Sequence, residues 1–141
     1  MGNETQATLA DIKYTVEYNA PISKVWEAVA TAEGMAAWFM PSDFEPTLGH
    51  VFHLNAGQFG MSPCKVTEID PPNSLSFNWG KDWTLTFELK ELDGKTEFTV
   101  IHSGWDAGKV TEFGAPHTPI RENMEQGWAG IVKKLQEYVE A

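Results

Sequence analysis

The sequence predicts an α+β domain in which a curved antiparallel sheet of about six strands wraps around a long C-terminal helix. Residues 118–141 carry apolar side chains at spacings of three and four, which is typical of a helix with one buried face. Residues 48–102 alternate apolar and polar side chains in short runs separated by turn sequences, which indicates an antiparallel meander. No second helix of similar length is predicted, so the sheet must cover the terminal helix.

The N-terminal part should contain one strand and two helices. Residues 1–7 are expected to be frayed, and residues 12–18 alternate as a half-buried strand does. Pro21 suits the first turn of a helix whose apolar stripe runs to Val29. A second short helix follows at about 32–38, before a loop marked by Pro41 and Pro46.

The meander follows from Leu48 onward. Strands are predicted around 51–54, 62–69, 74–79 and 83–89, and a last strand carries Phe98, Val100 and His102 in one phase. The sequence Asp70-Pro71-Pro72-Asn73 is a strong turn signal, and Asp93-Gly94 is typical of a two-residue hairpin turn.

The terminal helix should begin near Thr118, which can act as the N-cap, with Pro119 in the first turn. Gly127 and Gly130 are unusual in a helix interior. They indicate either close packing against the sheet or room for a bound molecule. The predicted buried face consists of Met124, Trp128, Ile131, Leu135 and Tyr138, widened by Ile120 and Val139.

Composition narrows the classes of partner. The length of 141 residues fits one domain, taken as residues 1–141, and the formal charge is −10. We expect no nucleic-acid partner and no membrane insertion, because no basic cluster and no long apolar run is present. One cysteine, Cys64, excludes an internal disulfide, and the first residues lack the pattern of a signal peptide, so a cytoplasmic location is expected.

Four ordered pieces of the sequence, within about residues 8–139, carry a family resemblance. They are Ala20-Pro21 with Val25-Trp26; Ala32-Glu33-Gly34-Met35 with Trp38-Phe39 and Pro41; Val66 to Pro72 with Leu75, Phe77 and Trp79; and His102 to Trp105 with Gly127-Trp128, Leu135 and Tyr138. Together they resemble the heat-shock protein 90 ATPase activator homologue-like family of the START-like (SRPBCC) superfamily. The resemblance implies a helix-grip fold and a deep apolar cavity that binds hydrophobic molecules.

The predicted cavity lies between the terminal helix and the sheet, and its lining is apolar and aromatic with few polar groups, as in most ligand sites. His102 faces inward and needs a hydrogen-bond partner, which is either Ser103, a backbone carbonyl or Tyr138, or else a polar atom of a ligand. The expected lining residues are Trp38, Phe39, Phe52, Phe59, Trp79, Phe87, His102, Trp105, Met124, Gly127 and Trp128.

No catalytic or metal site is predicted. His50 and His53 would point to opposite faces of a strand, and Cys64 after Pro63 fits a small buried thiol better than a nucleophile. We expect no cofactor.

The main functional hypothesis is therefore a cytosolic binding protein for a small, mostly apolar molecule that is lipid-like or aromatic and polyketide-like. Two alternatives remain open. The region from Trp38 to Phe44 could dock on a chaperone or another protein, or the same cavity could serve an enzyme of unknown reaction.

Overall fold

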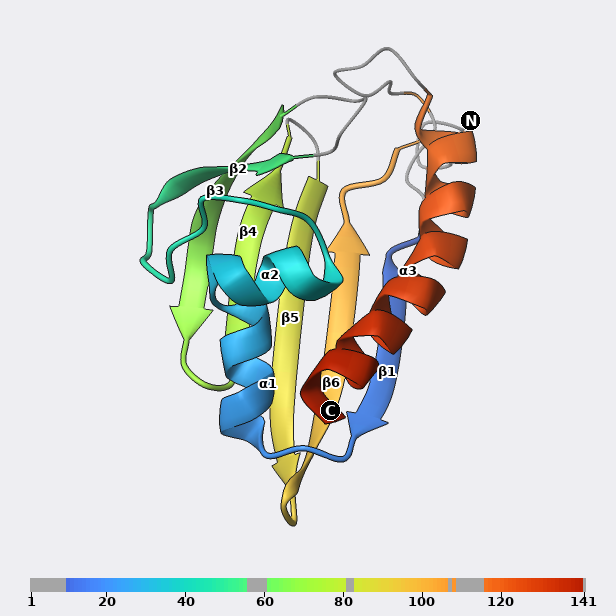
Figure 1. Ribbon diagram of the computed structural model, residues 1–141. Helices are drawn as coiled ribbons and strands as arrows, with labels where there is room; N and C mark the ends of the chain where they lie inside the picture. Colours follow the sequence, from blue (N-terminus) through green and yellow to red (C-terminus); the bar gives the residue numbers. More distant parts are fainter. Residues whose placement is uncertain (1–9, 56–60, 81–82, 107, 109–115, 141) are drawn as a thin grey trace.

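In the described part of the chain, six strands form one antiparallel sheet and three helices lie across one of its faces (Figure 1). The computed structural model describes residues 10–55, 61–80, 83–106, 108 and 116–140. The predicted α+β architecture is confirmed. The elements in chain order are β1 (Ile12–Tyr18), α1 (Ile22–Val29), α2 (Ala32–Trp38), β2 (Val51–Asn55), β3 (Met61–Asp70), β4 (Ser74–Trp79), β5 (Trp83–Leu92), β6 (Lys95–Ser103) and α3 (His117–Glu140).

The strand order is β1-β6-β5-β4-β3-β2, so the first strand pairs with the last and β2 lies at the opposite edge. In the β1–β6 pair, Ile12 lies opposite His102 and Tyr18 lies opposite Thr96. The hairpin between β5 and β6 turns at Asp93 and Gly94, both of which have positive φ as the predicted two-residue turn requires. Helix α3 packs next to β1 and runs alongside it, so the start of α3 lies near the start of β1 and its C-terminal end lies near the end of β1.

Helices α1 and α2 approach each other closely because of a glycine. Thr31 caps α2 by accepting a hydrogen bond from the Gly34 amide at 2.9 Å. A Cβ atom at Gly34 would lie 2.5 Å from the Ala28 carbonyl oxygen, so no larger residue fits there without a shift. Trp38 at the end of α2 donates its indole hydrogen to the same Ala28 carbonyl at 2.7 Å.

The buried face of α3 differs from the prediction in two residues. Trp128, Val132, Leu135 and Val139 are buried, whereas Tyr138 is 41% exposed. The prediction missed Val132 and was wrong for Tyr138. Positions 128, 132, 135 and 139 fall within one narrow arc of a helix, and position 138 lies on its flank.

One other expectation for α3 is also wrong. The helix begins at His117, so Thr118 lies inside the first turn and is not the N-cap. Of the two alternatives for Gly127, the structure excludes close packing, because a Cβ atom built there meets nothing within 4 Å. The same is true of Gly130.

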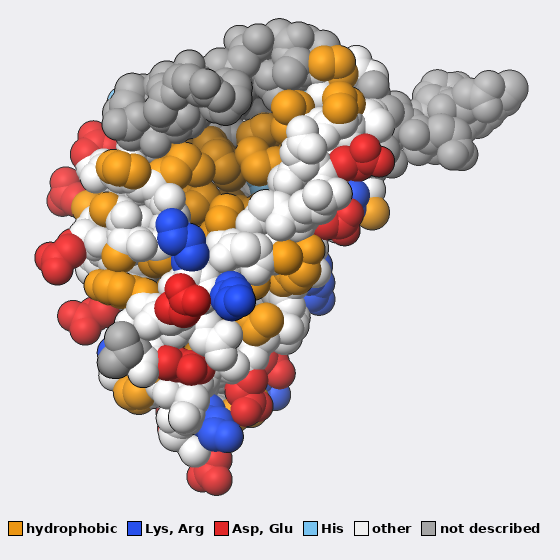
Figure 2. All heavy atoms as spheres, turned by 45° about the vertical axis from the view of Figure 1, so that its right-hand side comes forward, with side chains coloured by type: hydrophobic (Ala, Val, Ile, Leu, Met, Phe, Trp, Pro, Cys, Tyr) orange, Lys and Arg blue, Asp and Glu red, His pale blue; other side chains and the backbone are white. Residues whose placement is uncertain are grey.

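The apolar core lies between the sheet and the three helices, and part of it reaches the surface. Figure 2 shows hydrophobic side chains gathered around a hollow beside the N-terminal half of α3. Partly buried side chains from the end of α2 and from α3 pack against the core: Phe39, Met40, Ile120, Met124 and Ile131.

Within the described residues, no helix is long and apolar enough to cross a membrane.

Candidate binding site

Four tryptophans surround His102 under α3, and we call this group the indole cluster: Trp79, Trp83, Trp105 and Trp128. Trp79 ends β4 and lies opposite Trp83 at the start of β5, while His102 lies one residue before the end of β6. The imidazole centroid is between 4.6 and 6.1 Å from the centroid of each indole ring. The strand alternation therefore carries His102 into an almost entirely aromatic environment.

His102 has one hydrogen-bonded ring nitrogen and one without a partner. The indole Nε1 of Trp128 lies 3.0 Å from His102 Nδ1. An indole N–H can only donate, so Nδ1 must be the acceptor and the ring hydrogen must sit on Nε2. His102 is fully buried, and its Nε2 has no hydrogen-bond partner among the described residues.

The partner of His102 corrects an expectation. Ser103 donates to the Thr84 carbonyl at 3.3 Å, and Tyr138 is on the exposed flank of α3, so neither of them satisfies the imidazole. Trp128 satisfies Nδ1 instead. The Nε2–H group, which has no partner in the described part of the chain, is available to a polar ligand atom, which was the other expected partner.

His102 is neutral at physiological pH. Burial disfavours the imidazolium form, and the nearby charges of Arg121 and His117 disfavour it further, so the pKa of His102 falls from 6.5 to about 3. The site therefore presents a neutral hydrogen-bond donor and carries no positive charge on His102.

A second buried donor lies next to the first. Trp83 is only 8% exposed, and its Nε1 has no hydrogen-bond partner within the described ranges. The Trp83 ring meets the His102 ring edge to face, with 4.9 Å between centroids. By contrast, the Nε1 hydrogen of Trp105 is used, because it bonds the His102 carbonyl at 2.9 Å.

His117 holds the start of α3 against the indole cluster. It is fully buried, and its Nδ1 accepts a hydrogen bond from the Asp106 amide at 3.1 Å. Its ring lies 5.8 Å from the Trp83 ring and 5.7 Å from the Trp105 ring. This packing explains why the helix begins one residue before Thr118.

Phe39 connects the indole cluster to α2. Its ring stacks on Trp128 with 5.4 Å between centroids, meets Trp79 edge to face at 5.6 Å, and stacks on Trp38 at 5.3 Å. Phe39 is only partly buried, so this aromatic chain extends from the buried His102 environment to the surface between α2 and α3.

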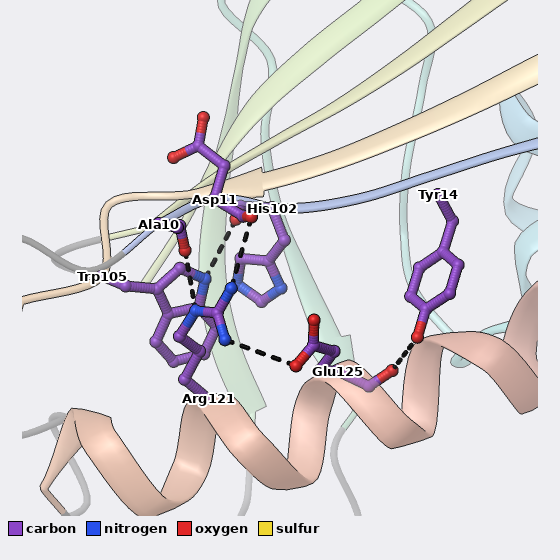
Figure 3. Close-up of polar contacts among 7 residues, drawn as sticks. All are labelled: Ala10, Asp11, Tyr14, His102, Trp105, Arg121 and Glu125. Carbon is purple, nitrogen blue, oxygen red and sulfur yellow. Dashed lines mark hydrogen bonds and ion pairs between the residues drawn. The ribbon is translucent and has the colours of Figure 1, made fainter.

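Contacts with β1 fix the position of α3 (Figure 3). Arg121 reaches from α3 to the start of β1, where its Nε donates to the Ala10 carbonyl at 2.7 Å and a terminal nitrogen donates to the Asp11 carbonyl at 3.3 Å. One turn later, the Tyr14 hydroxyl donates to the Glu125 carbonyl at 2.7 Å. These contacts hold the helix segment that carries Trp128.

The remaining predicted site residues are not all near His102. Phe87 is buried in the core and contacts Trp38 edge to face, and Phe52 is a buried residue of β2 that contacts Phe44 and Phe77. Met124 is partly buried on α3, while Gly127 is exposed there. Phe59 lies outside the described residues. Whether any of these residues contacts a ligand stays a prediction.

The expected lining residues do not include Trp83, His117 or Arg121. For Trp83 the sequence does carry a signal, because its phase with Leu85 predicts that it can line the space between the helix and the sheet. His117 and Arg121 had no comparable signal, since their roles depend on where the start of α3 meets the sheet.

Two other candidate sites have different properties. In the predicted docking region, Trp38 and Phe44 are buried, and Phe39 and Met40 are partly buried against the core. A separate open groove of about 450 Å³ near the C-terminal end of α3 has a mixed, partly charged lining that includes Lys24, Glu27 and Tyr138. Among the described residues, no three His, Cys, Asp or Glu side chains are placed to hold a metal ion.

A family model described as Activator of Hsp90 ATPase homolog 1-like protein matches residues 19–140. The solution structure of protein BH1534 from Bacillus halodurans is similar, with a TM-score of 0.84 and 44% sequence identity over 94% of this chain and 99% of that chain. No protein with a curated description matches.

More distant structures share the fold. The crystal structure of DynU16, from the dynemicin biosynthetic locus, has a TM-score of 0.75 at 24% identity and covers 93% of this chain and 47% of that chain. The solution structure of the Aha1 dimer from Colwellia psychrerythraea has a TM-score of 0.71 at 17% identity, covering 94% of this chain and 97% of that chain.

Proposed function

The chain belongs to the Activator of Hsp90 ATPase homolog 1-like family, and from its indole cluster we propose that it binds a small, mostly apolar molecule between α3 and the sheet. In this complex a ligand atom accepts the hydrogen of His102 Nε2. The observation that carries the proposal is this buried donor, which has no partner in the described part of the chain.

An unsatisfied buried donor is costly for a folded protein. Leaving one without a partner costs about 1 to 3 kcal/mol, and buried polar groups are therefore nearly always hydrogen-bonded. A ligand that accepts from Nε2 recovers this energy while its apolar part buries surface against the indole rings. The site thus combines apolar walls with a few donors that fix orientation, as small-molecule sites usually do.

The aromatic walls favour a flat ligand. Trp79 stacks on the imidazole at 5.2 Å, and Phe39 stacks on Trp128 at 5.4 Å, so the surroundings of His102 consist largely of ring faces and edges. Ring faces gain most from other flat π systems. An aromatic, polyketide-like molecule fits this chemistry better than a long alkyl chain. A lipid-like ligand whose carbonyl reaches Nε2 is the weaker form of the same proposal.

The hollow beside α3 supports an approach from that side. Hydrophobic side chains gather around it in Figure 2, and Phe39 and Met124 are only partly buried. A ligand that entered between α2 and α3 would meet Phe39 before it reached the indole cluster.

The test is a titration of nitrogen-15-labelled protein with a library of lipids, flavonoids and polyketides, followed by NMR. A bound ligand should shift the indole signals of Trp79, Trp83 and Trp128 and the Nε2–H signal of His102. If no compound shifts these signals, or if every shift lies away from the indole cluster, the proposal fails.

A matched pair of variants makes the test sharper. His102→Phe keeps a buried ring and removes the donor, and it should weaken binding of the best ligand by about tenfold. His50→Phe is the control, because His50 lies near Asp43 and Phe52, away from the indole cluster, and its Nε2 faces the Asp43 carbonyl at 3.1 Å. The control should bind as the wild type does.

A further inference from the structure

The geometry points to Trp128 as the residue that decides which kind of ligand atom the site recognises. We infer that Trp128 holds the hydrogen of His102 on Nε2, so that the site selects ligands that present a hydrogen-bond acceptor and rejects those that present only a donor. This inference rests on the proposed function for its ligand, but its structural part can be tested without one.

The first step is the hydrogen bond between the two side chains. Trp128 Nε1 and His102 Nδ1 are 3.0 Å apart in the buried core. If the imidazole carried its hydrogen on Nδ1, two N–H groups would face each other at this distance and both would lose their partner. The Nε2–H form is therefore strongly favoured, and Trp128 acts through His102 as a positioning residue.

The second step is that the Trp128 ring cannot easily turn away. Its side chain is buried, and Phe39 stacks on it. Hydrogen bonds from β1 fix α3 on either side of it: the Tyr14 hydroxyl bonds the Glu125 carbonyl, and the Tyr18 hydroxyl bonds the Val132 carbonyl, each at 2.7 Å. Figure 3 shows the first of these bonds together with the Arg121 contacts.

The third step concerns what the indole cluster offers to a ligand. Two buried nitrogens here, His102 Nε2 and Trp83 Nε1, have no partner among the described residues and carry hydrogens, and Trp105 Nε1 is already bonded to a carbonyl. A ligand carbonyl or ether oxygen would meet these donors. A ligand N–H in the same place would meet hydrogen atoms, and its own donor would lose its partner on leaving water.

The direct test uses NMR of the two ring nitrogens in free, nitrogen-15-labelled protein. We expect His102 Nδ1 to be unprotonated, Nε2 to be protonated, and a through-hydrogen-bond coupling to join Trp128 Nε1 to His102 Nδ1. A hydrogen found on Nδ1, or no coupling to Trp128, overturns the inference. Because this measurement uses the wild-type protein without a ligand, it does not depend on any variant folding.

Trp128→Phe should remove the preference of His102 for the Nε2–H tautomer. In this variant Nδ1 has lost its donor, so the spectrum should report a mixture of the Nδ1–H and Nε2–H forms. Trp26→Phe is the control, because it makes the same change at a partly buried tryptophan of α1 that belongs neither to the indole cluster nor to the expected lining. The control should keep the wild-type tautomer. An unchanged tautomer in Trp128→Phe would show that Trp128 is not the determinant.

Selectivity is measured with three flat probes of similar shape: 9-fluorenone, which presents a carbonyl acceptor; carbazole, which presents an N–H donor; and fluorene, which presents neither. The wild type and Trp26→Phe should prefer fluorenone to carbazole by about tenfold or more. In Trp128→Phe this preference should fall toward parity, with fluorene reporting any change caused by shape alone.

The outcomes separate the two proposals. Equal affinity for fluorenone and carbazole in the wild type, or a preference that Trp128→Phe leaves intact, refutes the inference while the proposed function stands. Failure of all three probes to bind refutes acceptor selectivity for flat ligands and counts against the proposed function, even when the tautomer is as expected.

Discussion

Acidification should destabilise the protein through His102, and the size of the effect follows from its burial. The pKa of His102 is about 3 in the folded protein and 6.5 in an unfolded chain, so the unfolded chain binds the additional proton as the pH falls. The contribution of His102 to stability is complete above pH 6.5 and is lost as the pH falls from 6.5 toward 3. Between about pH 7.5 and about pH 5.5 the free energy of unfolding should fall by about 1.4 kcal/mol through His102.

This value depends little on how far the folded-state pKa falls. Any folded-state pKa below about 4.5 gives nearly the same loss over that interval, because the folded imidazole then stays neutral throughout. What the prediction requires is that the ring remains buried with Trp128 as its partner, since exposure would restore the ordinary pKa.

Urea unfolding of the wild type and of His102→Asn at both pH values measures this contribution. The asparagine side-chain oxygen can take the place of Nδ1 and accept from Trp128, but it does not titrate. Between about pH 7.5 and about pH 5.5, the free energy of unfolding of the wild type should fall by about 1.4 kcal/mol more than that of the variant. All other titrating groups contribute equally to both proteins. An equal pH dependence in the two proteins would refute the account of a buried, neutral His102.

Three substitutions test the packing around the site, each followed by urea unfolding. Gly34→Ala should destabilise the protein by about 1 to 3 kcal/mol, because its Cβ would lie 2.5 Å from the Ala28 carbonyl oxygen; an unchanged midpoint would argue against this close approach. Tyr18→Phe should cost about 0.5 to 1.5 kcal/mol by removing the hydrogen bond to the Val132 carbonyl, and no loss would mean that this bond contributes nothing. Gly127→Ala should instead stabilise α3 by up to about 1 kcal/mol, since the added Cβ meets nothing within 4 Å, and a loss would contradict its exposure.

The order of helices and strands could be predicted because the apolar residues of each element recur at a clear spacing. Strands with one buried face alternate, and α3 repeats at three and four, so strand, two helices, meander and long helix followed from local pattern alone. The family resemblance, confirmed by the match over residues 19–140, gave the same fold independently. The ends of elements do not follow from the local pattern, as Thr118 illustrates, because His117 joins α3 through packing against Trp83 and Trp105.

The site could be predicted only in part. The inward direction of His102 follows from its phase with Phe98 and Val100, and the same logic reaches Trp79. The bond from Trp128 to His102 could not be predicted, because it joins residues 26 positions apart on a helix and a strand. Whether position 138 or position 132 faces the core likewise depends on how α3 is rotated over the sheet, and contacts such as the Tyr18 hydrogen bond to the Val132 carbonyl set that rotation.

The most direct test of the central claim is a crystal structure of the protein with the tightest-binding compound from the ligand titration. The account predicts a flat ligand that lies against the indole cluster, with an oxygen or another acceptor atom about 2.7 to 3.2 Å from His102 Nε2. A ligand seated elsewhere, or one in the indole cluster that leaves Nε2 without an acceptor, would contradict it.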